Sequence, residues 1–435
     1  MSEKQTPLGA LVTAGAMQNA AEAITDTIFM VKDISNAYLV TTADGDVMIN
    51  TGFIGNGPRT KDLFAPHRTG PLRRIILTQS HADHYGALPE QLETDTHIIA
   101  GAGFTETAEY FDRLAPFLAR RSGKLWASLT RRNGPPPVPP KVVPDVEVSD
   151  VLAFEHGGRS FEVHKTSGGE TLCAVFVWLP AERTIFTGNL FGPVWRAMPN
   201  LVTIRGDRPR LVRAYLRSLD TVRALEPDLV ITGHGEPIRG AHSIRADLDA
   251  MRAAVVHIER ETIAGMNAGK SVHALMRDIT LPEDGRIGEF HGKTSWVVRA
   301  IWEENAGWFH YADGTTGLYH VPRSAVDADL AALAGTAPLV ARALAHLDAG
   351  RPLEALHLVE IALTAEPADP QALAVRKSAL ERLATDAAGR NLSETMWLKA
   401  EIADVDAILA AGDRTAPRPD TGSPAATAGN AALGD

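Results

Sequence analysis

The sequence contains very little cysteine. Cys173 is the single cysteine among 435 residues, so no disulfide framework and no zinc site made of cysteine thiolates can form within one chain. We expect Cys173 to be a small buried residue on a strand, because a free cysteine behaves as a small apolar side chain.

Long apolar runs and a surplus of positive charge are absent as well. No stretch reaches the roughly 18 apolar residues that span a bilayer, and residues 1–24 lack the basic start and strong apolar core of a signal peptide. The net charge is −10 with no long basic run, which argues against nucleic acid as the main partner. We therefore expect a cytoplasmic protein with no membrane span and no nucleic-acid partner.

What is present is enough apolar sequence for a large core. Apolar residues make up 45% and charged residues 22% of the chain, and its length suggests two or three domains. Between residues 27 and 240, two runs of short strand patterns are each followed by helical patterns. Two sheets between helical layers fit this order. The predicted strands are Ile28–Val31, Ala37–Thr41, Val47–Asn50, Arg74–Leu77, Phe161–His164, Ala174–Leu179, Thr184–Phe186 and Asp228–Thr232.

The second half of the chain changes character. From about Ser243 the pattern is helical, and Leu344–Leu373 resembles a single tetratricopeptide unit that must pack on the rest of the chain or on a second subunit. Residues 413–435 are poor in hydrophobic bulk, and we expect a disordered tail there. Arg120–Asp145 is basic and then rich in proline, which is typical of a loop or lid.

One short motif offers metal-ligand side chains. His81, Asp83 and His84 follow an apolar strand within Thr78–His84, and imidazole and carboxylate groups suit zinc and related metals. Strand-end loops carry sites in folds of this class. The motif alone is equally compatible with a polar loop that forms its own hydrogen bonds.

Three later segments strengthen the metal interpretation. Each follows a predicted strand, and each places a polar side chain beside glycines: Glu170 after Gly168-Gly169, Asn189 after Gly188, and His234 between Gly233 and Gly235. All four segments in this order are a specific pattern.

This pattern resembles the metallo-β-lactamase superfamily, and within it the linear alkylsulfatases. Asn200-Leu201-Val202-Thr203-Ile204-Arg205-Gly206 is similar to that family's Asn-Leu-x-Thr-Leu-Arg-Gly run, and Glu170 is similar to the Glu of its Thr-Pro-Gly-Thr-Glu ligand segment. The basic residues Ala119–Arg121 and Arg131–Pro135 look like its active-site cover. His291–Ser295 and Gly307–Phe309 look like the start of its dimerisation domain. The resemblance covers residues 25 to 410.

The resemblance implies a fold and a domain order. It implies an αββα sandwich, the metallo-β-lactamase fold of the α/β class, over residues 1–242. An all-α alkylsulfatase-type dimerisation domain over residues 243–412 would then make a homodimer. The metal ligands it implies are Gln79, His81, Asp83, His84, Glu170, Asn189 and His234.

Two positions depart from the superfamily pattern. Gln79 stands where the first motif histidine belongs, and a neutral amide is a weaker donor for zinc than imidazole. Asn189 stands where the superfamily has a bridging acid, so Asp83 and Glu170 are the obvious anionic ligands. With two dications and a hydroxide, about one positive charge would stay unbalanced. One zinc ion, two zinc ions or another divalent metal therefore all remain open, and so does a protein that binds no functional metal.

The resemblance also implies roles for residues near the metal. Arg205 and Arg210 would hold a sulfate or carboxylate by bidentate hydrogen bonds, with Asn200 as a neutral donor. Asp83 and Tyr85 are the catalytic candidates, although Tyr85 can equally pack at a helix start. Aromatic and sulfur-containing side chains after Asn189 could wall a pocket, but core packing is the more common use; they are Phe191, Trp195 and Met198. Outside the motif, we expect His291, His310 and His320 to be structural.

Three functions remain open from the sequence. The first is a metal-dependent hydrolase that cleaves an alkyl sulfate ester, a small anionic substrate, with a metal-bound hydroxide. The second is a hydrolase of the same fold acting on a lactone, thioester or other ester. The third is a dimeric binding protein that has lost its full metal site, which Gln79 and Asn189 favour. The sequence decides neither the substrate nor whether the C–O or the S–O bond breaks.

Overall fold

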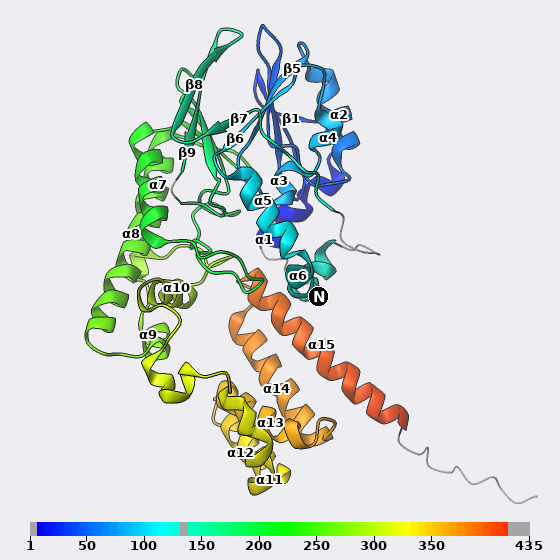
Figure 1. Cartoon of the computed structure of the whole chain (residues 1–435), viewed down its shortest axis with the longest axis vertical. Coiled ribbons are helices and arrows are strands. Elements are labelled where there is room, and N and C mark those ends of the chain that lie inside the picture. The colour runs from blue at the N-terminus through cyan, green and yellow to red at the C-terminus, as the bar shows by residue number, and fades with distance from the viewer. Residues whose placement is uncertain (1–6, 131–137, 167, 416–435) are drawn as a thin grey trace, which may run out of the picture. The chain divides into compact units, whose positions relative to one another are not determined.

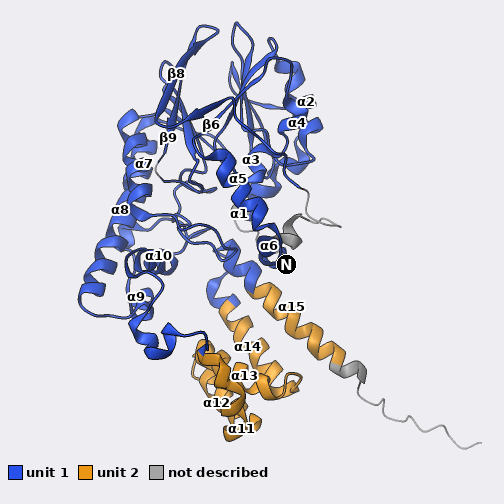
Figure 2. Ribbon diagram, viewed as in Figure 1, with its two compact units in different colours: residues 1–322, 384–397 blue, residues 323–383, 398–435 orange. Residues whose placement is uncertain are grey.

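The computed structural model describes residues 7–130, 138–166 and 168–415 (Figure 1). The described residues form two compact units (Figure 2): residues 1–322 with 384–397, and residues 323–383 with 398–435. The helices of the first unit are α1 (Pro7–Thr13), α2 (Gly57–Phe64), α3 (Ala82–Tyr85), α4 (Leu88–Gln91), α5 (Phe104–Arg113), α6 (Ala115–Thr130), α7 (Val212–Leu225), α8 (Ala241–Asn267), α9 (Val272–Asp278) and α10 (Thr294–Ala306).

Two sheets form the centre of the first unit. Among the described residues, one sheet is seven-stranded in the order β1-β2-β3-β4-β5-β6-β7, and the other is six-stranded in the order β13-β12-β11-β10-β9-β8. The first sheet contains β1 (Glu22–Thr25), β2 (Ile28–Val31), β3 (Ala37–Val40), β4 (Asp46–Ile49), β5 (Leu72–Leu77), β6 (His97–Gly101) and β7 (Val146–Val148). The second contains β8 (Val151–His156), β9 (Arg159–Lys165), β10 (Val175–Leu179), β11 (Thr184–Gly188), β12 (Leu229–Thr232) and β13 (Ile238–Arg239).

The sheets pack face to face, with helices on their outer faces (Figure 1). Side chains from both sheets share one buried cluster, in which Met30, Val47 and Ile76 of the first sheet accompany Val177 and Ile231 of the second. Alternating side chains of each sheet point outward and pack under helices in two further clusters. The predicted αββα sandwich is therefore confirmed.

Strand direction places the polar loops at one edge. β4 pairs parallel with β5, and β11 pairs parallel with β12, so the carboxyl ends of each pair lie at the same edge of their sheet. The residues that follow these strands include Asn50 after β4, His81 after β5, Asn189 after β11 and His234 after β12. The sandwich thus delivers four separated segments to one place, as loops at strand ends commonly do.

Part of the predicted lid is helical. Residues 115–130 form α6, so Arg120 and Arg121 lie on a helix and the expectation of a loop there is wrong. Proline, which cannot donate a backbone hydrogen bond, begins only at Pro135, so nothing local prevents a helix before it. The remaining predicted cover residues, Arg131–Pro135, lie outside the described residues.

The second unit is helical. Its helices are α11 (Asp327–Ala334), α12 (Thr336–Asp348), α13 (Pro352–Ala365), most of α14 (Pro370–Ala387) and most of α15 (Leu392–Thr415). Gly350, at φ 73°, makes the turn between α12 and α13, where a side chain would be strained. Small residues let the helices approach closely, and the tetratricopeptide-like pair packs on α14 through Ala343, Ala355, Ala362, Ala372 and Ala379.

The structure also bears on two boundaries. α15 continues to Thr415, so the predicted tail does not begin at residue 413, and residues 416–435 are not described. The boundary predicted after residue 242 stays a prediction.

In the described chain no single helix meets the length and hydropathy needed to cross a membrane, although the bent pair 323–334 and 336–348 meets them together.

Candidate metal centre and active site

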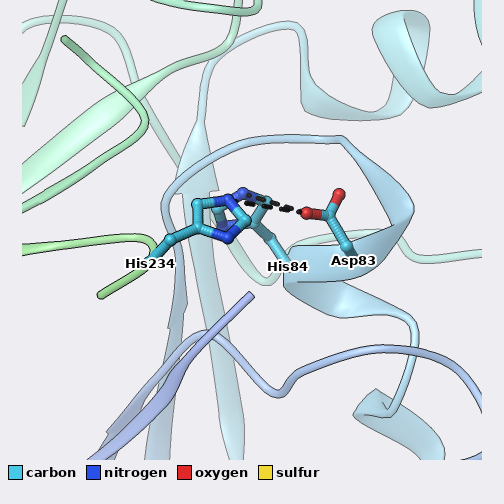
Figure 3. A group of neighbouring side chains, drawn as sticks. All are labelled: Asp83, His84 and His234. Carbon is cyan, nitrogen blue, oxygen red and sulfur yellow. Dashed lines mark ion pairs between the residues drawn. The ribbon is translucent and has the colours of Figure 1, made fainter. Parts of the chain in front are cut away.

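Three side chains come together at the ends of β5 and β12. Asp83 and His84 lie on the short helix α3, and His234 follows β12 (Figure 3). One ligand atom from each lies within 4.8 Å of the other two. Asp83 Oδ2 is 3.7 Å from His84 Nε2 and 3.9 Å from His234 Nε2. Two imidazoles and one carboxylate at this spacing are a donor set that zinc accepts.

One ring nitrogen of each histidine in this group lacks a partner among the described residues. His84 and His234 are buried, yet His84 Nε2 and His234 Nδ1 have no hydrogen-bond partner among the described residues. Burying an unpaired polar atom is costly, so such atoms need an explanation. A bound cation explains His84 Nε2, which faces Asp83, and the His234 nitrogen nearest Asp83 is Nε2, beside the Asn189 amide. The residues present therefore fit a divalent metal.

A hydrogen-bond chain orients the His84 ring. Its Nδ1 lies 3.0 Å from Ser35 Oγ, and Ser35 donates in turn to the Gly233 carbonyl at 3.2 Å. Asn50 Nδ2 also lies 3.1 Å from this Nδ1, so Ser35 and Asn50 together hold the ring with Nε2 turned towards Asp83. Burial lowers the pKa of His84 to about 4, so the ring is neutral at neutral pH, which is the metal-binding form.

The rest of the group also has the protonation state that a metal requires. Burial alone would raise the pKa of Asp83, but His84, His234 and His81 outweigh burial and lower it. Burial lowers the pKa of His234. One ionised carboxylate and two neutral imidazoles face the same point at neutral pH.

Glycine is required beside His234. A Cβ on Gly233 would lie 2.2 Å from Asn189 Oδ1 and 2.8 Å from His84 Cε1. Neither neighbour is the end of a long flexible side chain, so any larger residue would push His84 or Asn189 out of position. The glycine of the Gly-His-Gly segment thus serves the packing of the ligand group.

The second predicted ligand set is organised differently. His81 Nδ1 lies 3.3 Å from Gln79 Nε2 and 3.6 Å from Glu170 Oε2, while Gln79 Oε1 is buried without a partner among the described atoms. Asn189 links the two sets, because its Nδ2 lies 3.0 Å from Glu170 Oε2 and 3.1 Å from His234 Nε2. An amide therefore bridges the two halves where the superfamily pattern has an acid.

The two predicted arginines reach this site, but a carboxylate that we did not predict lies between them. Asp207 Oδ2 is 3.3 Å from Arg205 Nη2, 3.2 Å from Arg210 Nη2 and 3.5 Å from His81 Nε2. Burial opposes ionisation of Asp207, but His81, Arg210 and Arg205 outweigh it and lower its pKa to about 2. The segment that contains Arg205 and Arg210 therefore also contains the carboxylate that pairs with them.

Arg210 also holds the second ligand set. Its Nη1 lies 3.3 Å from Glu170 Oε1 and donates to the Asn200 carbonyl at 2.6 Å. Burial would raise the pKa of Glu170, but Arg210 and His81 hold it well below its usual range. Glu170 is thus an ionised carboxylate whose charge an arginine already balances.

His291 belongs to the site, which corrects the expectation that it is only structural. Its Nε2 lies 2.8 Å from Asn200 Nδ2 and 3.8 Å from Glu170 Oε1. Gly292 permits this approach, because a Cβ there would lie 2.2 Å from the Pro199 carbonyl oxygen. The His291-Gly292 pair was visible in the sequence, but nothing local indicated that it faces Asn200.

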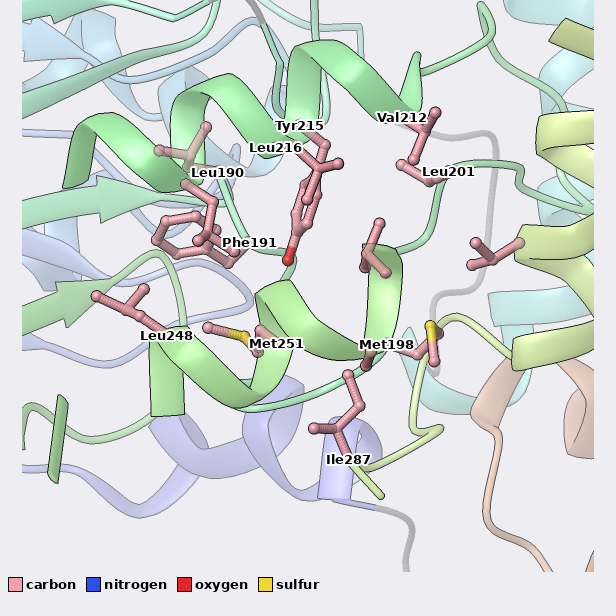
Figure 4. Close-up of a cluster of buried hydrophobic side chains, with 14 of the residues drawn as sticks. Leu190, Phe191, Met198, Leu201, Val212, Tyr215, Leu216, Leu248, Met251 and Ile287 are labelled. Carbon is pink, nitrogen blue, oxygen red and sulfur yellow. The ribbon is translucent and has the colours of Figure 1, made fainter. Parts of the chain in front are cut away.

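The remaining candidates, for a catalytic tyrosine and for an apolar pocket wall, are packed among buried side chains. The Tyr85 ring is buried against Phe104 with 5.3 Å between ring centroids, and burial raises its pKa to about 12. Tyr85 lines the same cavity as the ligands, and its catalytic role stays a prediction. Phe191 and Met198 lie in the core under α7 and α8 (Figure 4), with Trp195 packed against it, so the pocket-wall alternative for these three is wrong.

A cavity of about 1120 Å³ opens over these groups. On one side it is lined by Asp83 and His234 of the first ligand set, by His81 and Glu170 of the second, and by both arginines, Asn200 and His291. Its other walls are mainly apolar and come from the first helix, the β4–α2 loop, α5 and the segment after the undescribed residues 131–137: Val12, Phe53, Phe111, Val138, Val142 and Val143. The site is therefore polar at its base and apolar above, which suits an amphipathic small molecule.

Comparisons with known proteins agree with this geometry. Residues 30–234 match the metallo-beta-lactamase superfamily, and residues 275–401 match the alkyl sulfatase dimerisation family. The chain is 24% identical over 400 residues to an alkyl/aryl-sulfatase from Saccharomyces cerevisiae, which covers 83% of this chain and 60% of that protein. It is 24% identical over 401 residues to an (R)-specific secondary-alkylsulfatase from Pseudomonas sp., covering 84% of this chain and 58% of that one.

A solved structure has the same fold. The stereoselective inverting sec-alkylsulfatase from Pseudomonas sp. superposes with a TM-score of 0.76 at 21% identity, covering 89% of this chain and 65% of that chain. The chain spans less than two thirds of the length of each of these relatives. It is therefore built from a metallo-β-lactamase superfamily domain followed by an alkyl sulfatase dimerisation domain.

Proposed function

We propose that this chain is a hydrolase that cleaves an organic sulfate ester with the help of one divalent metal ion. The observation that carries the proposal is the group Asp83, His84 and His234 beside a large cavity, in which the buried His84 Nε2 has no partner among the described residues. The alkylsulfatase relatives support the substrate class, because their names specify sulfate esters.

One ion fits this chain better than two. The second ligand set has a neutral amide at Gln79, and its carboxylate, Glu170, is already paired with Arg210 at 3.3 Å. A second dication would compete with a fixed guanidinium for the same carboxylate and would lack a bridging acid at Asn189. Zinc suits the two imidazoles and one carboxylate of the first set, and we include zinc as the metal in the proposal.

Each group of the site has a chemical task in this proposal. A divalent ion held by Asp83, His84 and His234 would supply Lewis acidity and lower the pKa of a water molecule. Arg205 and Arg210 would orient the anionic head of the ester, and Asn200 with His291 would add neutral hydrogen bonds. The apolar walls would take the alkyl group and exclude bulk water. Tyr85, whose raised pKa keeps its hydroxyl protonated, would donate towards the leaving oxygen.

A second function is favoured by one observation. Asp207 already satisfies both arginines, so the base of the cavity has less attraction for an anion than two free guanidinium groups would have. This favours the second candidate, a hydrolase of a neutral ester such as a lactone or thioester. The same metal group would serve either reaction.

Metal content is the first test of the proposal. Protein purified without chelator should contain about one divalent ion per chain by mass spectrometry of the metals, and His234→Gln should lower that content at least about tenfold because it removes a ligand. His257→Gln, on α8 away from the cavity, is the matched control and should keep the ion. Native protein without stoichiometric metal would instead support the non-catalytic binding protein.

Substrate class is the second test. Metal-replete protein should release inorganic sulfate from octyl sulfate, and the His234→Gln variant should not. Hydrolysis of an octanoate ester or a lactone without release of sulfate from any alkyl sulfate would favour the second function and exclude the first.

The dimerisation domain supports a further part of the proposal. We expect a homodimer formed through residues 243–412, because residues 275–401 match a family described by its dimerisation. The anionic character of the substrate and the cytoplasmic location stay predictions.

A further inference from the structure

The carboxylate of Asp207 lies where an external anion would bind. Its Oδ2 is 3.5 Å or less from three nitrogens that belong to Arg205, Arg210 and His81, and its side chain is 5% exposed. Three donors converging on one buried oxygen are the arrangement that recognises a sulfate or carboxylate oxygen. Here the chain itself provides that oxygen.

The surrounding charges balance without any ligand. Two guanidinium groups, Arg205 and Arg210, face two ionised carboxylates, Asp207 and Glu170. An incoming monoanion would need the same Nη2 groups that Asp207 Oδ2 contacts, and it would approach a carboxylate of like charge. Like charges side by side at a buried site disfavour binding strongly.

We propose that Asp207 is a specificity-determining residue whose carboxylate competes with the substrate for Arg205 and Arg210, so that it weakens the binding of anionic esters relative to neutral ones. Compared with a site that has two free guanidinium groups, this site discriminates less strongly in favour of an anionic head and accepts an ester with an uncharged head more readily. A sulfate ester binds in this site only when Asp207 has moved off the two arginines.

The loop is built to keep Asp207 in place. Asp207 Oδ1 accepts a hydrogen bond from the Arg208 backbone N–H at 2.7 Å, and Gly206 adopts φ 96°, which a side chain would disfavour. Arg121 of α6 donates to the Ile204 carbonyl at 2.7 Å and fixes the start of the turn. Moving Asp207 aside therefore breaks local hydrogen bonds.

The arginines do not depend on Asp207 alone. Arg210 also contacts Glu170 Oε1 and the Asn200 carbonyl, so its guanidinium keeps two anchors when Asp207 loses its charge. Replacing Asp207 with the isosteric Asn should therefore leave the subsite built but with one positive charge no longer balanced. An anion would bind more tightly to this unbalanced positive charge.

The inference rests on the proposed function for the position of the substrate. Its test uses binding of inorganic sulfate and no turnover, so the inference can fail while the proposed hydrolase stands, and the reverse also holds. Calorimetric titration of sulfate into the full-length protein at constant ionic strength gives the dissociation constant.

We expect Asp207→Asn to bind sulfate about tenfold or more tightly than the native protein, and Asp207→Glu, which keeps the charge, to remain weak. The matched control is Asp220→Asn, because Asp220 also lies between two arginines, Arg223 at 3.2 Å and Arg252 at 2.7 Å, but on α7 outside the cavity. This control should bind sulfate as the native protein does. Equal or weaker binding by Asp207→Asn would overturn the proposal.

A measurement on the native protein covers the case in which Asp207→Asn does not fold. Phenylglyoxal modifies accessible guanidinium groups, and mass spectrometry reports its addition to Arg205, whose side chain is 28% exposed. If Asp207 occupies the subsite, sulfate at roughly millimolar concentration should give Arg205 no protection, as expected for weak binding. Strong protection of Arg205 by sulfate at that concentration would show that Asp207 does not compete, and the inference would be wrong.

Discussion

At the scale of single residues, the metal group depends on space as much as on ligands. Gly233 separates β12 from His234, and its missing side chain leaves room for Asn189 and for the His84 ring. The ligand motif accounts for which atoms could hold a metal. The glycine accounts for why two histidines from different loops can face the same point.

Replacing Gly233 with alanine should therefore damage metal binding more than folding. The new Cβ would lie 2.2 Å from Asn189 Oδ1 and 2.8 Å from His84 Cε1, so the two side chains must shift. We expect metal affinity to fall by about 10- to 100-fold, as with other changes around metal ligands. The unfolding free energy should fall by about 1–3 kcal/mol, as in overpacked cores. Metal titration and thermal unfolding measure both.

Gly123 offers the matched control for this substitution. It lies on the exposed side of α6, and a Cβ there would meet no atom within 4 Å. Gly123→Ala should leave metal affinity unchanged and raise the stability of the helix slightly, by about 0.5–1 kcal/mol. Unchanged metal affinity in Gly233→Ala would show that the ligand group tolerates the displacement and that our packing argument is mistaken.

The sequence predicted ligands better than it predicted their charge partners. His81, Asp83, His84 and His234 were visible because ligand types beside strand ends form a recognisable local pattern. Asp207 lies within the same run as both arginines, yet a carboxylate next to arginines on a loop is usually a solvated surface group. Its role comes from burial against His81, which is 126 positions away and which only the fold brings near.

At the scale of elements, helix α15 is connected to the site through its first residues. Asn391 is buried, and its Oδ1 accepts a hydrogen bond from the Glu394 backbone N–H at 3.1 Å, which caps the helix. Its Nδ2 donates to the Glu289 carbonyl at 3.1 Å and the His291 carbonyl at 3.0 Å. One side chain therefore starts the helix and holds the segment that carries His291.

Substituting Asn391 with aspartate should separate these two tasks. A carboxylate still caps the helix, but it cannot donate. The Glu289 and His291 carbonyls therefore lose this donor, and so does the Gly292 carbonyl in a buried contact at 3.4 Å. We expect the unfolding free energy to fall by roughly 3 kcal/mol, given about 1–3 kcal/mol for each unsatisfied buried group. Hydrogen exchange should rise at residues 289–292, and chemical denaturation gives the stability.

Asn305→Asp is the control for the loss of an amide donor. Asn305 donates to the single carbonyl of Ile301 on an exposed part of α10, so the change should cost less than about 0.5 kcal/mol. If hydrogen exchange at residues 289–292 stayed at the native level in Asn391→Asp, the segment that carries His291 would not depend on the Asn391 side chain for its position.

Prediction of helices and strands from the sequence succeeded where the apolar pattern was clear and failed where the apolar run was short or was overlooked. The apolar run Ile28–Val31 predicts a strand and agrees with β2, and the amphipathic pattern of Leu211–Leu225 predicts a helix and agrees with α7. β6, at His97–Gly101, was not predicted. Its short apolar run is equally compatible with a buried helix, and its parallel pairing with β5 is a property of the whole sheet. β8 alternates exposed and half-buried positions, so its signal was present but was not recognised.

At the scale of the whole molecule, exposed aromatic side chains indicate where a second copy would bind. Trp308, Tyr311 and Tyr319 are 77%, 91% and 68% exposed, and all three lie within residues 275–401, which match the alkyl sulfatase dimerisation family. Large aromatic side chains are rarely left in water together, and they are enriched at the centre of protein interfaces. We therefore expect this segment to be buried between two copies of the chain.

Replacing these three residues with serine should convert the dimer to a monomer at micromolar concentration. A stable interface buries about 1,200–2,000 Å², and truncating a central aromatic residue commonly costs about 2 kcal/mol or more, so three such changes should weaken dimerisation by several orders of magnitude. Light scattering coupled to size-exclusion chromatography gives the mass directly. Met17→Ser removes a side chain of similar exposure, 91%, outside the matched range, and should leave the native mass unchanged. A triple variant that keeps the dimer mass would place the interface elsewhere, and a native chain that elutes as a monomer would refute the dimer itself.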